Sequence, residues 1–139
     1  MNKSLLDTDI LSEIGKGVDQ VVARNATAYR NTFGRYTFSA VTVAEVVRGF
    51  QKKQSVRRLQ AFVASLSSME VIPLEESAAV VAGRIAGELE RLGRPIGLAG
   101  LMIAAIALEH HLELVTGNTA HFQRVQQLGY PLTLANWRQ

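Results

Sequence analysis

Two carboxylates, Asp7 and Asp9, stand one residue apart directly after the apolar pair Leu5 and Leu6. In an α/β protein this pattern predicts a short buried strand that delivers Asp7 at its carboxyl end, where ligand and metal sites lie. Carboxylate oxygens are the ligands that Mg²⁺ and Mn²⁺ prefer. The stretch therefore predicts the first part of an acidic metal site. In the alternative interpretation, Asp9 caps the following helix and Asp7 is a turn residue.

Glu45 and Asn118 are the residues that we expect to act with Asp7. Each follows a predicted strand, and the carboxyl ends of parallel strands share one edge of a sheet. The start of an apolar helix at Leu98 is predicted to reach the same edge. A metal held by such oxygen ligands would activate a water molecule and neutralise charge on a phosphodiester.

Structural alternatives exist for both residues. Glu45 is also the acidic member of a Thr-x-x-Glu capping box that begins at Thr42. Asn118 lies in a Gly-Asn-Thr turn, where Asn is common for local reasons. The hydroxyls of Thr8 and Thr116 are candidates for hydrogen bonds to the site's carboxylates, although Thr is also frequent in strands and helix caps.

Apolar periodicity predicts alternating strands and helices along the chain. Strands are expected at 4–6, 36–40, 69–74, 111–116 and 130–134, and helices at 10–14, 18–32, 42–50, 51–66, 75–92, 98–109 and 119–125. The alternation predicts an α/β fold with a central, mostly parallel sheet and helices on both faces. The length of 139 residues fits a single domain over 1–139.

The composition narrows the class of protein. The chain has no cysteine, so a metal would have to be held by oxygen or histidine ligands, and the lack of thiols fits a cytoplasmic location. No apolar run approaches the ~20 residues that cross a bilayer, and no export signal is visible. The net charge of +3 permits contact with a nucleic acid backbone without requiring it.

Four segments, in this order and spacing, resemble the PIN-domain toxins of the VapC family, and more narrowly their FitB-like branch. The segments are 5–9 (Leu-Leu-Asp-Thr-Asp), 39–45 (Ser-Ala-Val-Thr-Val-Ala-Glu), 96–105 (Ile-Gly-Leu-Ala-Gly-Leu-Met-Ile-Ala-Ala) and 115–122 (Val-Thr-Gly-Asn-Thr-Ala-His-Phe). The resemblance covers essentially the whole chain. It implies a PIN-domain fold and Mg²⁺- or Mn²⁺-dependent endonucleolytic cleavage of RNA.

The same resemblance implies partners and site residues. It implies the toxin of a type II toxin–antitoxin pair, bound by a VapB-like antitoxin in a hetero-oligomer and commonly a homodimer. The first two acidic positions of the family fall on Asp7 and Glu45, and the fourth, Asp or Asn in relatives, falls on Asn118. Asp9 stands where Asn or Asp is usual.

Gly100 is the departure from the family pattern. Relatives carry Asp at this position, and Glu109, the next acid, lies about 13.5 Å along the helix. Gly costs about 0.8–1 kcal/mol relative to Ala inside a helix, so local propensity does not favour it. The charged ligands left are Asp7 and Glu45, with Asp9 as a third candidate. We therefore hypothesise that nuclease activity is lost or impaired in this chain.

Two other functions compete with an active nuclease. In the first, the chain is a non-catalytic PIN module that binds an antitoxin and, through it, DNA. In the second, the pair Asp7 and Asp9 would be the Asp-x-Asp loop of a haloacid-dehalogenase-like phosphatase. That chemistry also uses a late acidic pair to bind Mg²⁺, and no Asp follows Asp19, so the sequence disfavours the phosphatase.

Overall fold

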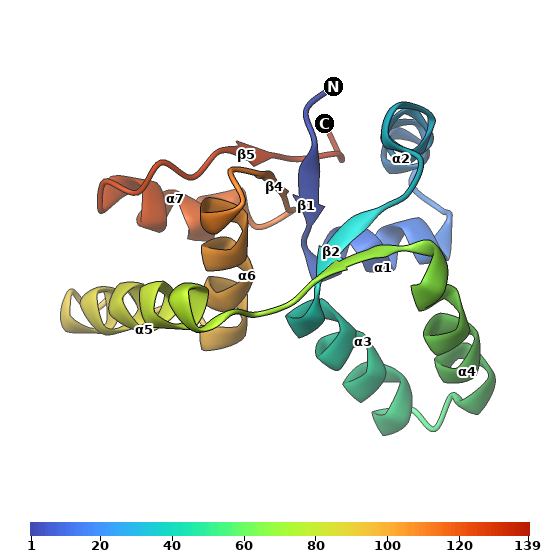
Figure 1. Ribbon diagram of the computed structural model, residues 1–139, viewed down its shortest axis with the longest axis horizontal. Helices are drawn as coiled ribbons and strands as arrows, with labels where there is room; N and C mark the ends of the chain where they lie inside the picture. The colour runs from blue at the N-terminus through green and yellow to red at the C-terminus, as the bar shows by residue number, and fades with distance from the viewer.

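Five short parallel strands form the centre of the molecule, and helices surround them (Figure 1). The computed structural model describes residues 1–139. The strands are β1 (Ser4–Leu6), β2 (Thr37–Ser39), β3 (Glu70–Ile72), β4 (Glu113–Val115) and β5 (Leu134–Ala135). The helices are α1 (Thr8–Lys16), α2 (Gln20–Phe33), α3 (Ala40–Lys52), α4 (Val56–Ser65), α5 (Glu76–Arg91), α6 (Leu98–Glu109) and α7 (Thr119–Gln127), with a 3-10 turn at Leu66–Ser68. The predicted α/β class is confirmed.

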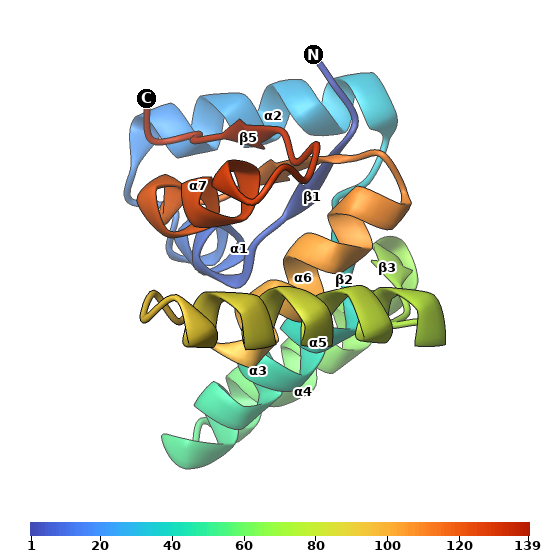
Figure 2. The same cartoon turned by 90° about the vertical axis from the view of Figure 1, so that its left-hand side faces the viewer.

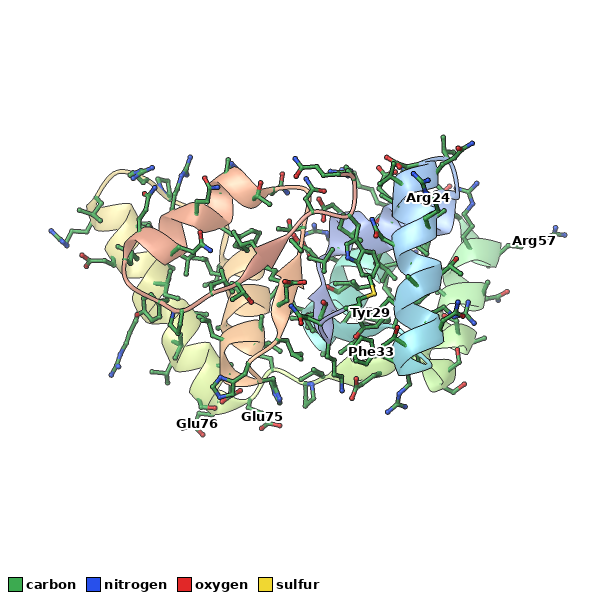
Figure 3. All side chains as sticks on the ribbon, turned by 90° about the horizontal axis from the view of Figure 1, so that it is seen from above. Arg24, Tyr29, Phe33, Arg57, Glu75 and Glu76 are labelled. Carbon is green, nitrogen blue, oxygen red and sulfur yellow. The ribbon has the colours of Figure 1, made fainter.

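The strands pair in two sets, in the orders β1-β4-β5 and β2-β3, and every pair is parallel. β1 and β2 lie side by side at the seam between the sets. Tyr29 closes this seam: its hydroxyl accepts a 3.3 Å bond from the Ser4 N–H and lies 3.1 Å from both the Ser4 carbonyl and Thr37 Oγ1. Tyr29 and Phe33 project from α2 toward the sheet (Figure 3).

Two hydrophobic cores lie on opposite faces of the sheet. Because successive strand residues point to opposite faces, Leu5 joins the core under α5, α6 and α7, whereas Leu6 joins the core under α1 and α2. The neighbouring strand β4 follows the same alternation: Leu114 pairs with Leu5 and lies in the first core, and Val115 pairs with Leu6 and lies in the second. Figure 2 shows α5 crossing in front of α6 on the first face. The prediction of helices on both faces is confirmed.

Several predicted helix boundaries were wrong. The helix α1 runs through Gly15 and ends at Gly17, which takes the left-handed φ of 66°. The helix α3 begins at Ala40, two residues before Thr42, because the Ser39 side chain caps it by accepting from the Thr42 N–H at 3.2 Å. The predicted helix over 51–66 is divided at Gln54, whose positive φ of 56° interrupts the helical path. The last strand lies at Leu134–Ala135, later than predicted.

The helix α6 is buried on nearly all sides, as its continuous apolar sequence predicts. It packs between the sheet and α5, and six of its residues are fully covered. No helix combines the length and the apolar character that crossing a bilayer demands. The first turn of α6 packs against α7, where a Cβ on Gly100 would lie 3.5 Å from Phe122 Cζ.

Candidate active site

Asp7 lies immediately after β1 and is almost fully buried, with 7% of its surface exposed. It caps α1, and its Oδ1 accepts a 2.8 Å hydrogen bond from the Thr8 N–H. Its Oδ2 accepts a 2.8 Å bond from the hydroxyl of Thr116, the residue after β4. The cap of α1 is therefore Asp7, and the alternative that assigned this role to Asp9 is wrong. These two donors, the backbone N–H of Thr8 and the hydroxyl of Thr116, fix the direction of the Asp7 carboxylate.

The surroundings of Asp7 disfavour its charge. Burial, together with a smaller repulsion from the nearby Asp9 carboxylate, raises the pKa of Asp7 to about 6, while the hydrogen bonds from Thr116 and Thr8 oppose this rise. Glu45 adds a still smaller repulsion that also raises the pKa. A buried carboxylate with two carboxylate neighbours is an environment in which a bound cation would be stabilising.

Glu45 meets Asp7 through Thr8. The Thr8 hydroxyl donates a 2.7 Å hydrogen bond to Glu45 Oε1 and lies 3.0 Å from the hydroxyl of Thr42. The interpretation of Glu45 as the acid of a capping box is wrong, because Ser39 caps α3 and Glu45 lies well inside the helix. Its carboxylate is instead held beside Thr8, the first residue of α1 after β1. The structure thus brings Asp7 and Glu45 together.

Asn118 is tied to the same hydroxyl that holds Asp7. Its backbone N–H donates a 3.0 Å bond to Thr116 Oγ1, which itself donates to Asp7. Asn118 occupies the cap position of α7, but its side chain makes no capping bond and the residue is exposed. The turn therefore does not use the Asn118 side chain, and its exposed amide is available to a ligand.

Asp9 contacts a different part of the site. Its Oδ2 accepts a 2.8 Å bond from the Gly117 N–H, and Arg138 Nη1 lies 3.6 Å from the same oxygen. Its Oδ1 is buried without a hydrogen-bond partner. Arg138 also donates to Glu13 Oε1 at 3.4 Å. Sequence reasoning missed Arg138 and Glu13, because no local spacing signals a contact between α1 and the segment that follows β5.

Gly100 is the third residue of α6, close to Phe122 of α7. A Cβ at this position would lie 3.5 Å from Phe122 Cζ and 3.9 Å from Ile96 Cγ2, which are ordinary van der Waals distances. The backbone does not require glycine, since φ lies outside the left-handed region. The first turn of α6 contains no acidic residue. Packing therefore permits a side chain at 100, and no structural need explains Gly100.

The candidate ligands are of the right chemical type for a divalent cation, but there are few of them. These candidates, the carboxylates of Asp7 and Glu45 and the amide oxygen of Asn118, are oxygen ligands of the type that Mg²⁺ and Mn²⁺ prefer. No group of three acidic or histidine side chains is close enough to hold a metal ion. Since Mg²⁺ can be held by one or two carboxylates with water completing its shell, the set fits a weakly bound ion.

A groove of about 770 Å³ lies between α1 and the α3–α4 pair. Its wall is mainly apolar and includes Leu11, Ile14, Phe50 and Phe62. Three exposed cations, Lys16, Lys53 and Arg58, also line it. An apolar surface with only basic charges beside it is complementary to an apolar segment that carries acidic residues.

Sequence comparison relates the chain to known nucleases. The model of the PIN domain family matches residues 4–128. A relative in Shigella flexneri, named tRNA(fMet)-specific endonuclease VapC, is 34% identical over 126 residues, which cover 90% of this chain and 93% of the relative. Ribonuclease VapC10 of Mycobacterium tuberculosis is 32% identical over 136 residues, which cover 96% of each chain.

Solved structures give the same relationship. DNA-bound VapBC from Salmonella typhimurium contains a chain that is 29% identical, with a TM-score of 0.79 and coverage of 99% of both chains. FitAcB from Neisseria gonorrhoeae contains a chain that is 25% identical, with a TM-score of 0.73 and coverage of 96% of both chains. The fold of this chain therefore matches that of one chain in each of these complexes over almost its whole length.

Proposed function

Because the chain belongs to the PIN-domain family, with VapC ribonucleases as its relatives, we propose that it is the toxin of a type II toxin–antitoxin pair, a metal-dependent endoribonuclease by ancestry that acts in the cytoplasm. PIN-domain VapC nucleases are generally dependent on a divalent metal. The observation that carries the proposal is that Thr8 bonds both carboxylates: its backbone N–H donates to Asp7 and its hydroxyl donates to Glu45.

Asp7 and Glu45 would hold the ion, which we propose to be Mg²⁺ or Mn²⁺, with Asn118 as a neutral ligand and Asp9 as a further candidate. When bound, the ion would supply an activated water and neutralise charge on the RNA phosphodiester. Thr8 and Thr116 hold the two carboxylates in place through their hydroxyls. The buried setting of Asp7 keeps bulk water away from one face of the site.

We propose further that Gly100 impairs catalysis in this chain. The resemblance to VapC toxins implies an acidic ligand at this position, and the present ligand set is small. The open contacts around Gly100 support this view, since neither packing nor backbone conformation accounts for a glycine. A carboxylate restored here would extend from the first turn of α6, where the helix dipole favours negative charge.

RNA cleavage in Mn²⁺ tests the proposed function. We expect weak or undetectable cleavage by the chain itself and a gain of roughly 10–100-fold in Gly100→Asp. The gain should disappear in the double variant Gly100→Asp with Asp7→Asn, which keeps the fold but removes the buried carboxylate. An inactive Gly100→Asp variant, or a double variant as active as the single one, would contradict the assignment.

The partner would be a VapB-like antitoxin. Related chains are found in complexes named VapBC and FitAB, some of them bound to DNA. We propose that an antitoxin segment with apolar and acidic residues occupies the groove between α1 and α3–α4, because Lys16, Lys53 and Arg58 are the only charges that line it. A homodimer, which the resemblance implies, stays a prediction.

The second candidate function is a non-catalytic module that binds the antitoxin and, through it, DNA. The small ligand set favours it, because antitoxin binding does not need a metal. Co-expression of the chain with its antitoxin distinguishes the two functions. A complex that forms and binds DNA would favour the non-catalytic module if the Gly100→Asp variant still fails to cleave RNA.

A further inference from the structure

Arg138 is the only cationic side chain that pairs with a carboxylate at this end of the sheet. It lies 3.6 Å from Asp9 Oδ2 and 3.4 Å from Glu13 Oε1. The other ion pairs of the molecule involve Glu70 and Glu88, which are elsewhere. Asp7 and Glu45 have no cationic partner. Of the acidic side chains at this end of the sheet, Asp9 and Glu13 thus share one guanidinium, and Asp7 and Glu45 have none.

The Arg138 guanidinium packs directly against the backbone of Gly117. A Cβ on Gly117 would overlap Arg138 Nη1 and would lie 2.6 Å from Asp9 Oδ2, so the absence of a side chain at 117 makes room for the Arg138–Asp9 pair. The φ of Gly117 is outside the left-handed region, and the backbone itself does not call for glycine. This fit places Arg138 against the loop that leads from Thr116 to Asn118.

We propose that Arg138 is an internal counter-ion that lowers the affinity of the Asp7–Glu45 site for divalent cations. The inference rests on the proposed function, since it takes this site as the cation site. Arg138 acts on the site through Asp9, because it pairs with the Asp9 carboxylate and the Asp9 charge repels that of Asp7. A divalent cation arriving beside Asp7 would therefore meet an Asp9 carboxylate whose charge Arg138 already partly neutralises.

We expect Arg138 to act on cation affinity through its charge and not by holding Asp9 in place. Asp9 Oδ2 also accepts a 2.8 Å bond from the Gly117 N–H, so we expect its carboxylate to stay anchored when Arg138 is replaced. The Arg138 side chain is 36% exposed and its two ion pairs are long, so its removal leaves the packing of the core intact. A neutral side chain should therefore raise cation affinity, whereas a lysine should preserve the wild-type value.

Mn²⁺ binding, followed by water-proton relaxation on the full chain at low salt, is the test. We expect Arg138→Gln to bind Mn²⁺ roughly three- to tenfold more tightly than the wild type, and the difference to shrink as salt screens the charge. Arg138→Lys should match the wild type. Arg91→Gln is the matched control, because it removes the same charge from the Glu88 pair on α5 and should leave Mn²⁺ affinity unchanged.

The outcomes separate the two proposals. If Mn²⁺ binding is lost in Asp7→Asn but is equal in the wild type and Arg138→Gln, the metal site stands and the role of Arg138 is refuted. That role is also refuted if Arg138→Lys and Arg138→Gln behave alike, or if Arg91→Gln shows the same gain. If no variant binds Mn²⁺ in a manner that depends on Asp7, both this inference and the proposed metal site are overturned.

Discussion

Thr116 holds Asp7 across the sheet: its hydroxyl donates a 2.8 Å hydrogen bond to Asp7 Oδ2 and accepts a 3.0 Å bond from the Asn118 N–H. One side chain thus connects the residue after β1 with the loop after β4. Thr116 is fully buried, so neither contact can be replaced by bulk water. The local order of the candidate site depends on this hydroxyl more than on any charge.

Thr116→Val should therefore destabilise the fold. The valine keeps the shape but leaves a buried carboxylate oxygen and an amide without partners, which costs about 1–3 kcal/mol in the free energy of unfolding. Urea denaturation measures the loss. Thr32→Val is the control, because its hydroxyl bonds to the Ala28 carbonyl on the exposed side of α2 and its loss should cost under about 0.5 kcal/mol. Equal losses in the two variants would contradict the role of Thr116.

Asp7→Asn should stabilise the metal-free protein at neutral pH. The pKa of Asp7 is raised from 3.8 to about 6, mainly by burial, so between these values the folded chain holds a proton that the unfolded chain has released. Stability then falls as pH rises from about 4 to about 6, and the ionised group costs up to about 3 kcal/mol above that range. Asn removes this cost and can still bond to Thr116.

The measurement is thermal or urea unfolding of both proteins in a chelator from pH 4 to pH 8. Asp7→Asn should exceed the wild type at pH 7.5, and the two curves should converge near pH 4, where Asp7 is largely protonated in the folded chain. A variant that is less stable than the wild type at pH 7.5 would mean that the charged form is favoured in the fold, contrary to its burial.

Gly100→Asp should strengthen Mn²⁺ binding by about tenfold or more, because each added carboxylate raises the affinity of a hard-cation site. Gly100→Asn is the matched control, since it has the same size and fits the same contacts with Phe122 and Ile96 but adds no charge. Calorimetric titration at constant pH compares the two. If Asn and Asp raise the affinity equally, position 100 acts through helix stability and not as a ligand.

Arg58→Glu should weaken antitoxin binding by at least about tenfold, because it places a negative charge beside a segment that we propose to be acidic. Arg57→Glu makes the same change one residue earlier, on a side chain that does not line the groove and that projects away from the molecule in Figure 3. Affinity and association rate for the co-purified antitoxin give the comparison. Similar losses in both variants would indicate a non-specific effect of net charge.

Residue patterns correctly predicted the buried strand before Asp7 but misplaced the start of the helix that carries Glu45. Leu5 and Leu6 before Asp7 were sufficient to predict a buried strand that ends in an acid, because local hydrophobicity determines such a strand. Glu45 was ambiguous, since Thr42 and Glu45 fit a capping box, and only the actual start of α3 at Ala40 removes the ambiguity.

Other features were beyond the reach of sequence patterns. The break at Gln54 depends on a left-handed conformation that residues other than glycine adopt rarely. The contact of Arg138 with Asp9 depends on how β5 and the following segment pack beside α1, and no periodicity records such a contact. Short-range features were thus predictable, whereas pairings between distant parts of the chain required the fold.

The pairing of β1 with β4 also determines when, during synthesis of the chain, the candidate site can form. Asp7 and Thr116 are 109 residues apart, and the strands that carry them are direct neighbours. Such non-local pairing forms late, and a chain grows from its N-terminus during translation. A nascent chain carries Asp7 and Glu45 long before it acquires Thr116 and Asn118. The candidate site is therefore incomplete on the ribosome until the segment that holds Thr116 and Asn118 has been synthesised.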